Sequence, residues 1–357
     1  MTDASTRQAP NGAATLASTM PLARGPAWAN RITLAPLTNW QSHADGTLGD
    51  DEYRWLTMRS QGGFGMTMTC AAHVQASGQG FPGQLGVWSD AHLPGLSRLA
   101  QGIRAAGSVS CLQLQHSGRR ADTALSGRPT VAPWADAETG ARALSTAEVQ
   151  QLVQDFISAA RRAERAGFEG VELHAAHGYL LAQFLDTEHN QRTDQYGGSA
   201  HNRNRILFEL IAGVRAATGP GFQLGLRLSP ERFGITMAES LALAQQVLDG
   251  GVSLVFGDDA LARKAAEGAD RLYIHQMGHV QSHFRIVDQD GHPPANAGVK
   301  QQFDDGRRVE HDHRASRSSR MTSAALRRSL RGAGPRSRAR MSCRVGRSSA
   351  LPTSRRM

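Results

Sequence analysis

Three side chains that can donate hydrogen bonds stand close together near the middle of the sequence. His174 and His177 are three residues apart, and Tyr179 follows His177 by two residues. They come after a short apolar run at 170–173 that is typical of a buried strand, so they would lie just beyond its carboxyl end. Folds that alternate strands and helices place their chemistry at this end. The three residues are therefore the candidate catalytic group.

Paired histidines also bind metal ions, so a metal site is the first alternative. A zinc site draws its further ligands from carboxylates, cysteines or histidines, and Glu172 is the one carboxylate at a suitable spacing. We expect its side chain on the other side of the strand from His174, so no metal site is predicted. Two imidazoles that face one point can instead donate hydrogen bonds to a carbonyl or nitro oxygen and stabilise negative charge that develops there.

Tyr179 is a candidate general acid. A phenol stays protonated at neutral pH and can deliver a proton to a carbon next to a carbonyl group. The alternative for Tyr179 is an aromatic side chain packed beneath the following helix. The residue pattern alone does not separate these two interpretations.

Two further polar residues lie in apolar strand patterns. Arg227 interrupts the run LGLRLSP, and a buried arginine is costly unless it has an anionic partner. That partner is either an anionic ligand or a carboxylate of the chain, Glu172 or Glu231. Gln113, in CLQLQHSGR, would face the same interior as Gln115 by strand alternation. Its amide can read a ligand edge that carries both donors and acceptors.

The elements that must position these residues alternate along the chain. Apolar residues recur at helical spacing in 50–61, 92–106, 145–167, 205–217 and 237–248, and short apolar runs typical of strands lie at 31–37, 64–69, 109–114, 170–173 and 222–228. Ser145 and Glu148 form a capping-box pattern at the start of the third helix. Residues 117–140 are expected to lie over the surface as a long loop or a small hairpin. Five alternations predict a parallel sheet covered by helices, and the (β/α)8 barrel is the familiar closed form.

Composition limits the class of protein. The chain has 357 residues, 40% of them hydrophobic, which suffices for one large barrel or two domains. Its net charge is +9, but 307–357 alone hold fifteen arginines and two acidic residues, so the rest is mildly acidic. Three scattered cysteines without a Cys-x-x-Cys pair predict a reducing cytoplasm. Residues 1–29 are expected to be a flexible lead-in, neither a signal peptide nor a membrane span.

The stretch HAAHGYLLAQFL at 174–185, followed by N-x-RTDxYGG at 190–198 and HNRNR at 201–205, resembles the signature of the old yellow enzyme family. Its members are flavin-dependent ene reductases and NADH:flavin oxidoreductases, and the resemblance runs from about Asn30 to about Asp249. It implies a (β/α)8 barrel that binds FMN, accepts hydride from NAD(P)H and passes it to an activated alkene. The implied partner is thus a small molecule, not a membrane or a nucleic acid.

The resemblance also implies roles for individual residues. His174 and His177 would hold the electron-withdrawing oxygen of the substrate, and Tyr179 would donate the proton. Arg227 would face the N1/O2 edge of the flavin and Gln113 its pyrimidine edge. The remaining cofactor positions lie at the first and second strand ends, where Thr38 replaces the Cys of one branch and Cys70 stands where many relatives carry Glu; these positions are Ala35, Pro36, Leu37, Thr38 and Ala71.

The resemblance stops after about Gly250. We therefore divide the chain into the lead-in 1–29, an incomplete flavin-binding barrel of five to six β/α units at 30–256, and a disordered Arg/Ser-rich region at 257–357 that does not resemble the family. The final strands of a complete barrel build the phosphate grip for FMN. The tail indicates either a lost reading frame or an arginine-rich RNA-binding arm. The functional alternative is a non-catalytic remnant that binds FMN poorly and persists as a homo-oligomer over its open edges.

Overall fold

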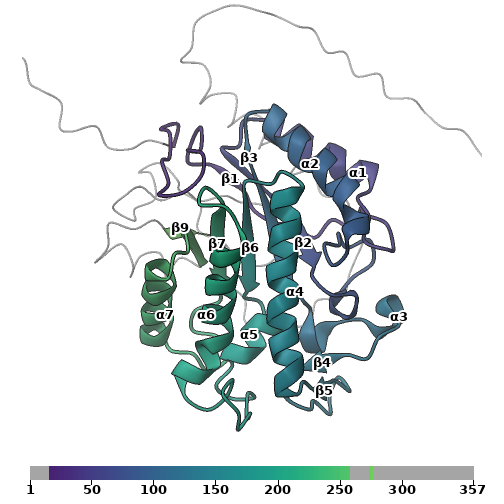
Figure 1. The fold of residues 1–357 in the computed structure, drawn as a ribbon, viewed down its shortest axis with the longest axis vertical. Helices are drawn as coiled ribbons and strands as arrows, with labels where there is room; N and C mark the ends of the chain where they lie inside the picture. Colours follow the sequence, from purple (N-terminus) through teal and green to yellow (C-terminus); the bar gives the residue numbers. More distant parts are fainter. Residues whose placement is uncertain (1–15, 258–272, 276–357) are drawn as a thin grey trace, which may run out of the picture. The chain divides into compact units, whose positions relative to one another are not determined.

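A computed structural model describes residues 16–257 and 273–275 (Figure 1). Seven strands form one sheet in the order β1-β2-β3-β6-β7-β8-β9, and every neighbouring pair is parallel. The sheet thus has the architecture predicted from the alternating pattern. Its strands are β1 (Thr33–Leu34), β2 (Met66–His73), β3 (Val109–Gln115), β6 (Gly170–Ala175), β7 (Gln223–Leu228), β8 (Leu254–Gly257) and β9 (Tyr273–His275). A separate pair joins β4 (Val131–Ala132) to β5 (Arg142–Ala143).

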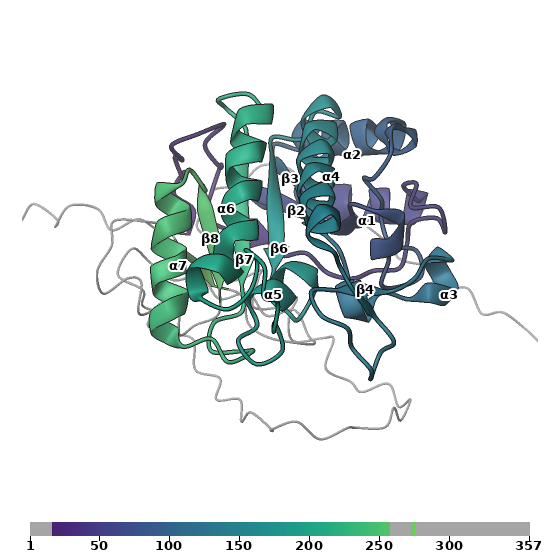
Figure 2. The same ribbon diagram turned by 60° about the horizontal axis from the view of Figure 1, so that its bottom comes forward.

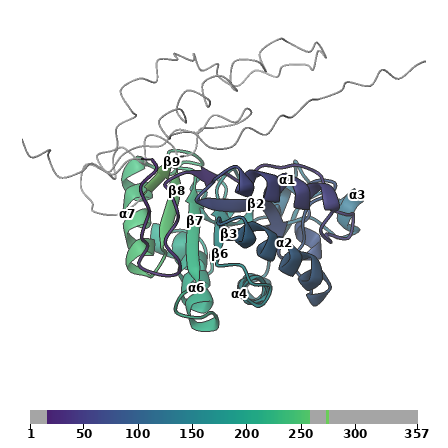
Figure 3. The same cartoon turned by 90° about the horizontal axis from the view of Figure 1, so that it is seen from above.

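The long helices cover one face of this sheet, each packed against the next (Figures 2 and 3). These helices are α1 (Asp50–Gln61), α2 (Leu93–Ala105), α4 (Thr146–Arg165), α6 (Ala200–Ala217) and α7 (Met237–Asp249). Two short helices, α3 (Thr123–Ser126) and α5 (Leu180–Leu185), lie in the loops that follow strands β3 and β6. A parallel sheet with helices on only one face leaves its other face to line the interior of a barrel.

Helix α4 shows why the sequence forms these elements. The predicted capping box is confirmed, because the Ser145 hydroxyl accepts from the Glu148 amide and the Glu148 side chain accepts from the Ser145 amide. Apolar residues at helical spacing turn one stripe toward the sheet. The buried residues of that stripe include Val149, Leu152, Val153, Phe156, Ala160 and Ala163.

The interior face carries a second apolar cluster that includes the start of the described chain. Trp28 is buried, and its indole Nε1 donates to Gln223 Oε1 at 3.0 Å, while Gln223 Nε2 donates to the Pro26 carbonyl at 2.8 Å. The cluster comprises Met20, Trp28, Met66, Met68, Val109, Cys111, Leu254 and Phe256. Met20 and Trp28 therefore anchor the stretch 16–29 on the sheet, although most of its other residues are exposed; of the lead-in predicted at 1–29, residues 1–15 lie outside the described part.

Three other features differ from the sequence expectations. Strand β2 continues to His73, four residues beyond the expected end, and α5 forms where only a loop was expected. Strand β9 pairs with β8 although it lies in the region assigned to a disordered tail; the rest of that region, 258–272 and 276–357, lies outside the described residues. Within the described chain β1 and β9 each pair with one neighbour, so the sheet there is an open part of a barrel, as predicted.

Among the helices of the described residues, none combines the length and the apolar character needed to cross a membrane.

Candidate active site

The strand register brings the candidate residues to one level of the sheet. Ala71 on β2 is the partner of Gln113 on β3, and Gln113 is the partner of Glu172 on β6. One step nearer the carboxyl ends, His174 on β6 is the partner of Arg227 on β7. Residues that are far apart in sequence thus occupy neighbouring positions on four adjacent strands. Except for Glu172, which lies in the middle of β6, all lie in the carboxyl-terminal half of their strands, which is the end of the sheet where the sequence predicted the chemistry.

The three predicted catalytic side chains converge. His174 Nε2 lies 3.2 Å from His177 Nδ1, and the two ring centroids are 4.9 Å apart. The ring of Tyr179 meets that of His174 edge to face, with centroids 5.1 Å apart and planes at 82°. His174 is almost fully buried on the strand, whereas His177 and Tyr179 are half-buried in the turn that follows. Two imidazoles and a phenol therefore share one small region, which is the geometry that their proposed roles require.

The turn that carries His177 is held in an unfavourable backbone conformation. His177 has φ = 58°, in the left-handed region that costs a non-glycine residue energy, and Gly178 follows with φ = 70°. Two contacts oppose that cost. The His177 amide donates to Ser229 Oγ at 2.9 Å, and Arg120 Nη1 donates to the His177 carbonyl at 2.6 Å. Strain that is held by such contacts indicates that the direction of the His177 side chain matters for function.

His174 is neutral at physiological pH. Burial lowers its pKa well below the usual value, and the positive charges of His177 and Arg227 lower it further. The Ala176 amide approaches His174 Nδ1 at 3.4 Å, which assigns that nitrogen as an acceptor and places the proton on Nε2. The Nε2 proton is then donated to His177 Nδ1 at 3.2 Å, so a substrate oxygen that enters beside the pair would replace His177 as its acceptor. A neutral His174 donor suits an oxygen that becomes negative only in the transition state.

A buried network of three side chains lies beneath these histidines. Arg227 donates from Nε to Glu172 Oε1 at 2.8 Å and from Nη2 to Glu172 Oε2 at 2.7 Å. Gln113 Nε2 donates to the same Oε1 at 2.6 Å. Of the partners considered for Arg227, the structure therefore shows Glu172 and not Glu231. The expectation that Glu172 faces away from His174 is wrong, because residues two apart on a strand share a face.

The network leaves one donor and one acceptor that a ligand can use. Within the described part of the chain, Arg227 Nη1 and Gln113 Oε1 form no hydrogen bond. The amide orientation of Gln113 is fixed chemically, because a carboxylate only accepts and so must face the NH₂ group. A flat heterocycle whose edge carries both acceptor and donor groups, as a flavin pyrimidine does, fits this pair. The residues present are thus compatible with the cofactor that the resemblance implies.

The segment after β1 is the least occupied part of the candidate site. Ala35, Pro36 and Leu37 are half-buried and Thr38 is exposed, and their role in cofactor binding stays a prediction. Beyond them the buried atoms Asn39 Nδ2, Gln41 Oε1 and Glu52 Oε1 have no hydrogen-bond partner in the described chain.

Cys70 is buried next to this segment, and burial raises the pKa of its thiol well above the usual value. The neighbouring Glu52 carboxyl is also buried, and its pKa is raised by that burial. A protonated, enclosed thiol is a poor nucleophile. Cys70 therefore behaves as a small apolar residue, and we assign it no chemical role.

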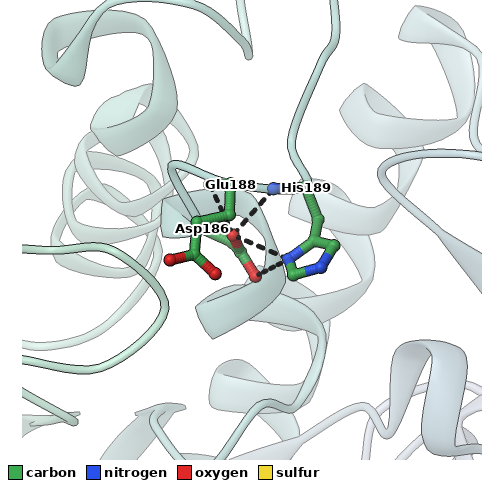
Figure 4. A group of neighbouring side chains, drawn as sticks. All are labelled: Asp186, Glu188 and His189. Atoms are coloured by element: carbon green, nitrogen blue, oxygen red, sulfur yellow. Dashed lines mark hydrogen bonds and ion pairs between the residues drawn. The ribbon is translucent and has the colours of Figure 1, made fainter.

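One group with metal-binding residue types occurs in the described residues, at Asp186, Glu188 and His189. Figure 4 shows that its interactions all end on the Asp186 carboxylate. Asp186 Oδ1 accepts from the amides of Glu188 and His189, and its Oδ2 lies 3.0 Å from His189 Nδ1. His189 also stacks on Trp134. These contacts form a turn after α5, and they satisfy Asp186 without a metal ion.

Two residues of the site, Arg120 and Ser229, were not predicted from the sequence, and Glu172 was predicted only in part. Glu172 was considered only as a metal ligand or ion-pair partner, and its strand parity could have placed it under His174. Arg120 and Ser229 were not singled out, although they hold the His177 backbone from distant loops; Arg120 also lies over the Tyr179 ring at 5.0 Å. No local pattern marks Arg120 and Ser229, because the fold alone brings them to the turn.

We expect the free energy of unfolding to fall as the pH drops from about 6.5 to about 4. Burial lowers the pKa of His73 to about 4 and of His116 to about 3, and it also lowers that of His174. The unfolded chain takes up these protons near pH 6.5 while the folded chain does not, so stability rises with pH in this window. Each histidine contributes up to about 1.4 kcal/mol per pH unit.

Urea unfolding at several pH values measures this slope. The His116→Gln variant is expected to have a shallower slope than the wild type, whereas replacement of the exposed His43 by Asn is expected to leave the slope unchanged. Equal slopes in the wild type and the His116→Gln variant would contradict the assignment. Glu52 acts in the opposite direction, since its raised pKa costs stability as the pH rises above about 4.5.

Comparisons with known proteins identify the family of the chain. The model of the NADH:flavin oxidoreductase / NADH oxidase family matches residues 26–249. The chain is 38% identical over 231 residues to the probable NADH-dependent flavin oxidoreductase YqiG of Bacillus subtilis, covering 62% of each chain. It is 37% identical over 228 residues to an NADPH dehydrogenase of Clostridium acetobutylicum, covering 62% of this chain and 67% of the relative. The chain thus spans about three fifths to two thirds of the length of these relatives.

Solved structures resemble the described fold. The old yellow enzyme homologue of Zymomonas mobilis has a TM-score of 0.67 and 26% identity, over 74% of this chain and 83% of the homologue. Morphinone reductase has a TM-score of 0.63 and 30% identity, over 69% of this chain and 72% of that protein. These likenesses confirm the barrel fold and the resemblance drawn from the HAAHGY motif. The chain belongs to the NADH:flavin oxidoreductase / NADH oxidase family.

Proposed function

We propose that this chain is an FMN-dependent oxidoreductase of the old yellow enzyme type that reduces activated alkenes with NAD(P)H. The observation that carries the proposal is the convergence of His174, His177 and Tyr179 beside the buried network of Arg227 and Gln113. Donors for a substrate oxygen, a proton source and a binding edge for a heterocycle then lie in one place. Relatives and structural neighbours named as flavin oxidoreductases and reductases support it.

The imidazoles bind and polarise the substrate in this proposal. His174 and His177 donate hydrogen bonds to the electron-withdrawing oxygen of the alkene, an enone carbonyl or a nitro group. Their hydrogen bonds strengthen as negative charge grows on that oxygen, which is a common and large source of catalysis. Arg120 and Ser229 keep His177 in its left-handed turn, so the donor position is set before the substrate arrives.

Tyr179 supplies the proton that completes the reduction. The phenol keeps its proton at neutral pH and transfers it to the carbon alpha to the electron-withdrawing group. Arg120 lies over the Tyr179 ring at 5.0 Å and helps to hold it in place beside the histidines. Bulk water then restores the proton, since Tyr179 is only half-buried.

Arg227 Nη1 and Gln113 Oε1 are the groups that would hold the flavin edge, with Ala71 and the segment Ala35–Thr38 beside them. FMN, when bound, supplies the hydride transfer between NAD(P)H and the alkene. A structure of morphinone reductase in complex with tetrahydroNAD, which resembles this chain with a TM-score of 0.65 and 30% identity, supports a nicotinamide donor. The free thiols Cys70 and Cys111 suit a reducing cytoplasm.

Addition of FMN tests the proposal. A ligand that binds only the folded chain raises the free energy of unfolding by about 2.7 kcal/mol at one hundred times its dissociation constant. We therefore expect a higher melting temperature with FMN than without it, and a yellow protein after gel filtration. Riboflavin without its phosphate is the matched control for the phosphate contribution. A protein that melts at the same temperature with and without FMN and stays colourless would contradict the proposal.

A second candidate is a non-catalytic remnant of such an enzyme, with poor or no FMN binding. The family match ends at residue 249, whereas the relatives extend beyond the part that the chain matches. This difference favours the remnant. An incomplete barrel has two open sheet edges, and pairing over them would give a homo-oligomer. The FMN experiment separates the two candidates, because the remnant gains no stability from the ligand.

A further inference from the structure

We propose that Glu172 is a positioning residue that sets both the orientation and the net charge of the groups facing the flavin, and thereby the flavin reduction potential. The inference rests on the proposed function. It goes beyond that function because Glu172 itself need not touch the cofactor. Its carboxylate lies behind Arg227 and Gln113 and is fully buried.

The Glu172 carboxylate orients the side chains of Arg227 and Gln113. Glu172 accepts three hydrogen bonds, two from Arg227 and one from Gln113. These bonds use Arg227 Nε and Nη2 and the Gln113 NH₂ group, so Arg227 Nη1 and Gln113 Oε1 are left for a ligand. A guanidinium held by two parallel bonds has one fixed plane. One carboxylate thus fixes two side chains on two neighbouring strands, β3 and β7.

Glu172 also compensates the positive charge of Arg227. Arg227 is 3% exposed and Glu172 is 0% exposed in their side chains, so water screens neither of them. An isolated buried arginine would favour the reduced flavin strongly, because reduction adds negative charge to the edge that the arginine faces. Glu172 neutralises most of this charge, and it leaves a directional donor instead of a full cation. The pair therefore lowers the potential relative to arginine alone.

The buried ion pair of Arg227 and Glu172 is not explained by stability alone. Desolvating two ions offsets most of their attraction, so a buried ion pair adds little net stability compared with apolar residues of the same size. Stability alone is therefore a weak reason for an ion pair at this position. A cofactor that must both accept a hydride and release it needs an intermediate potential. Charge compensation by Glu172 supplies a physical means of setting it.

The test compares two variants that separate charge from position. Glu172→Gln keeps the length and shape of the side chain and one acceptor oxygen, which can still serve Arg227 Nε and Gln113 Nε2, but it removes the negative charge and the acceptor of Arg227 Nη2. Glu172→Asp keeps the charge but shortens the side chain, so that one carboxylate no longer reaches both partners. The wild type and both variants are loaded with FMN. Dissociation constants are measured from flavin fluorescence and midpoint potentials from dye-equilibrated reduction. Circular dichroism checks that each variant folds.

We expect Glu172→Gln to raise the potential by about 30 mV or more, which is a tenfold change in the ratio of reduced to oxidised flavin for two electrons. Glu172→Asp is expected to weaken FMN binding at least tenfold with a potential close to that of the wild type. An unchanged potential in Glu172→Gln, or equal shifts in both variants, would overturn the charge role. Wild-type affinity in Glu172→Asp would overturn the positioning role. If the wild type binds no FMN, the proposed function itself fails, which is a distinct outcome.

Discussion

The Tyr179→Phe variant is expected to reduce an activated alkene about 10²–10⁴ times more slowly than the wild type, which is the usual contribution of a positioned general acid. Reduction of the flavin by NAD(P)H is expected to keep its rate, because that step takes no proton from the phenol. The ring remains in place beside His174, whose centroid is 5.1 Å away, so packing is preserved. Stopped-flow absorbance of the flavin measures the two half-reactions separately.

The matched control for this experiment is Tyr196→Phe. Tyr196 is also a buried aromatic residue, but its hydroxyl donates to Glu209 at 2.8 Å, away from the histidine pair. We expect Tyr196→Phe to affect stability and leave both half-reactions near their wild-type rates. If Tyr179→Phe reduces the alkene as fast as the wild type, another group or water supplies the proton, and Tyr179 is the packed aromatic residue of the alternative interpretation.

The Arg227→Met variant is expected to lose about 3–5 kcal/mol of the free energy of unfolding in the absence of any flavin. The loss arises because the Glu172 carboxylate is left buried with one remaining donor, Gln113 Nε2. The double variant Arg227→Met/Glu172→Leu removes the stranded charge as well, and it is expected to regain most of the loss. Urea unfolding followed by tryptophan fluorescence measures both values.

Arg54→Met provides the contrast, because Arg54 pairs with Asp51 on the exposed surface of α1. Surface ion pairs contribute little, so the variant should unfold close to the wild type. The prediction for Arg227 would fail if the single and double variants were equally stable. That result would mean that the carboxylate becomes protonated or reaches water at small cost. Because no ligand is involved, the experiment examines the network independently of the proposed activity.

The local patterns sufficed to predict most of the long helices and strands and the proximity of the two histidines and the tyrosine. Helical spacing in 145–167 and its capping box gave α4 closely, and His174, His177 and Tyr179 lie within six residues, so one strand end had to bring them together. The error at Glu172 came from the side-chain alternation and not from missing information. The network with Arg227 and Gln113 was less accessible, since it depends on the register of three strands.

Other parts of the structure have no local pattern to reveal them. Arg120 reaches the His177 carbonyl across 57 residues of sequence, and Ser229 reaches its amide across 52. The burial of Met20 and Trp28 within 16–29 could not be predicted from the sequence for the same reason. Their composition is that of a flexible segment, and their partners lie almost two hundred positions later. Only the folded sheet creates the apolar surface on which Trp28 packs.

That contact has a consequence for synthesis on the ribosome. Trp28 and its partner Gln223 are separated by 195 residues, which take about 10–40 s to add at common translation rates. During this interval the methionine-rich inner surface of β2 has been made but cannot yet be enclosed. Nascent chains with such surfaces attract chaperones or one another. Aggregation of the nascent chain is therefore most favoured between the synthesis of Trp28 and the synthesis of β7.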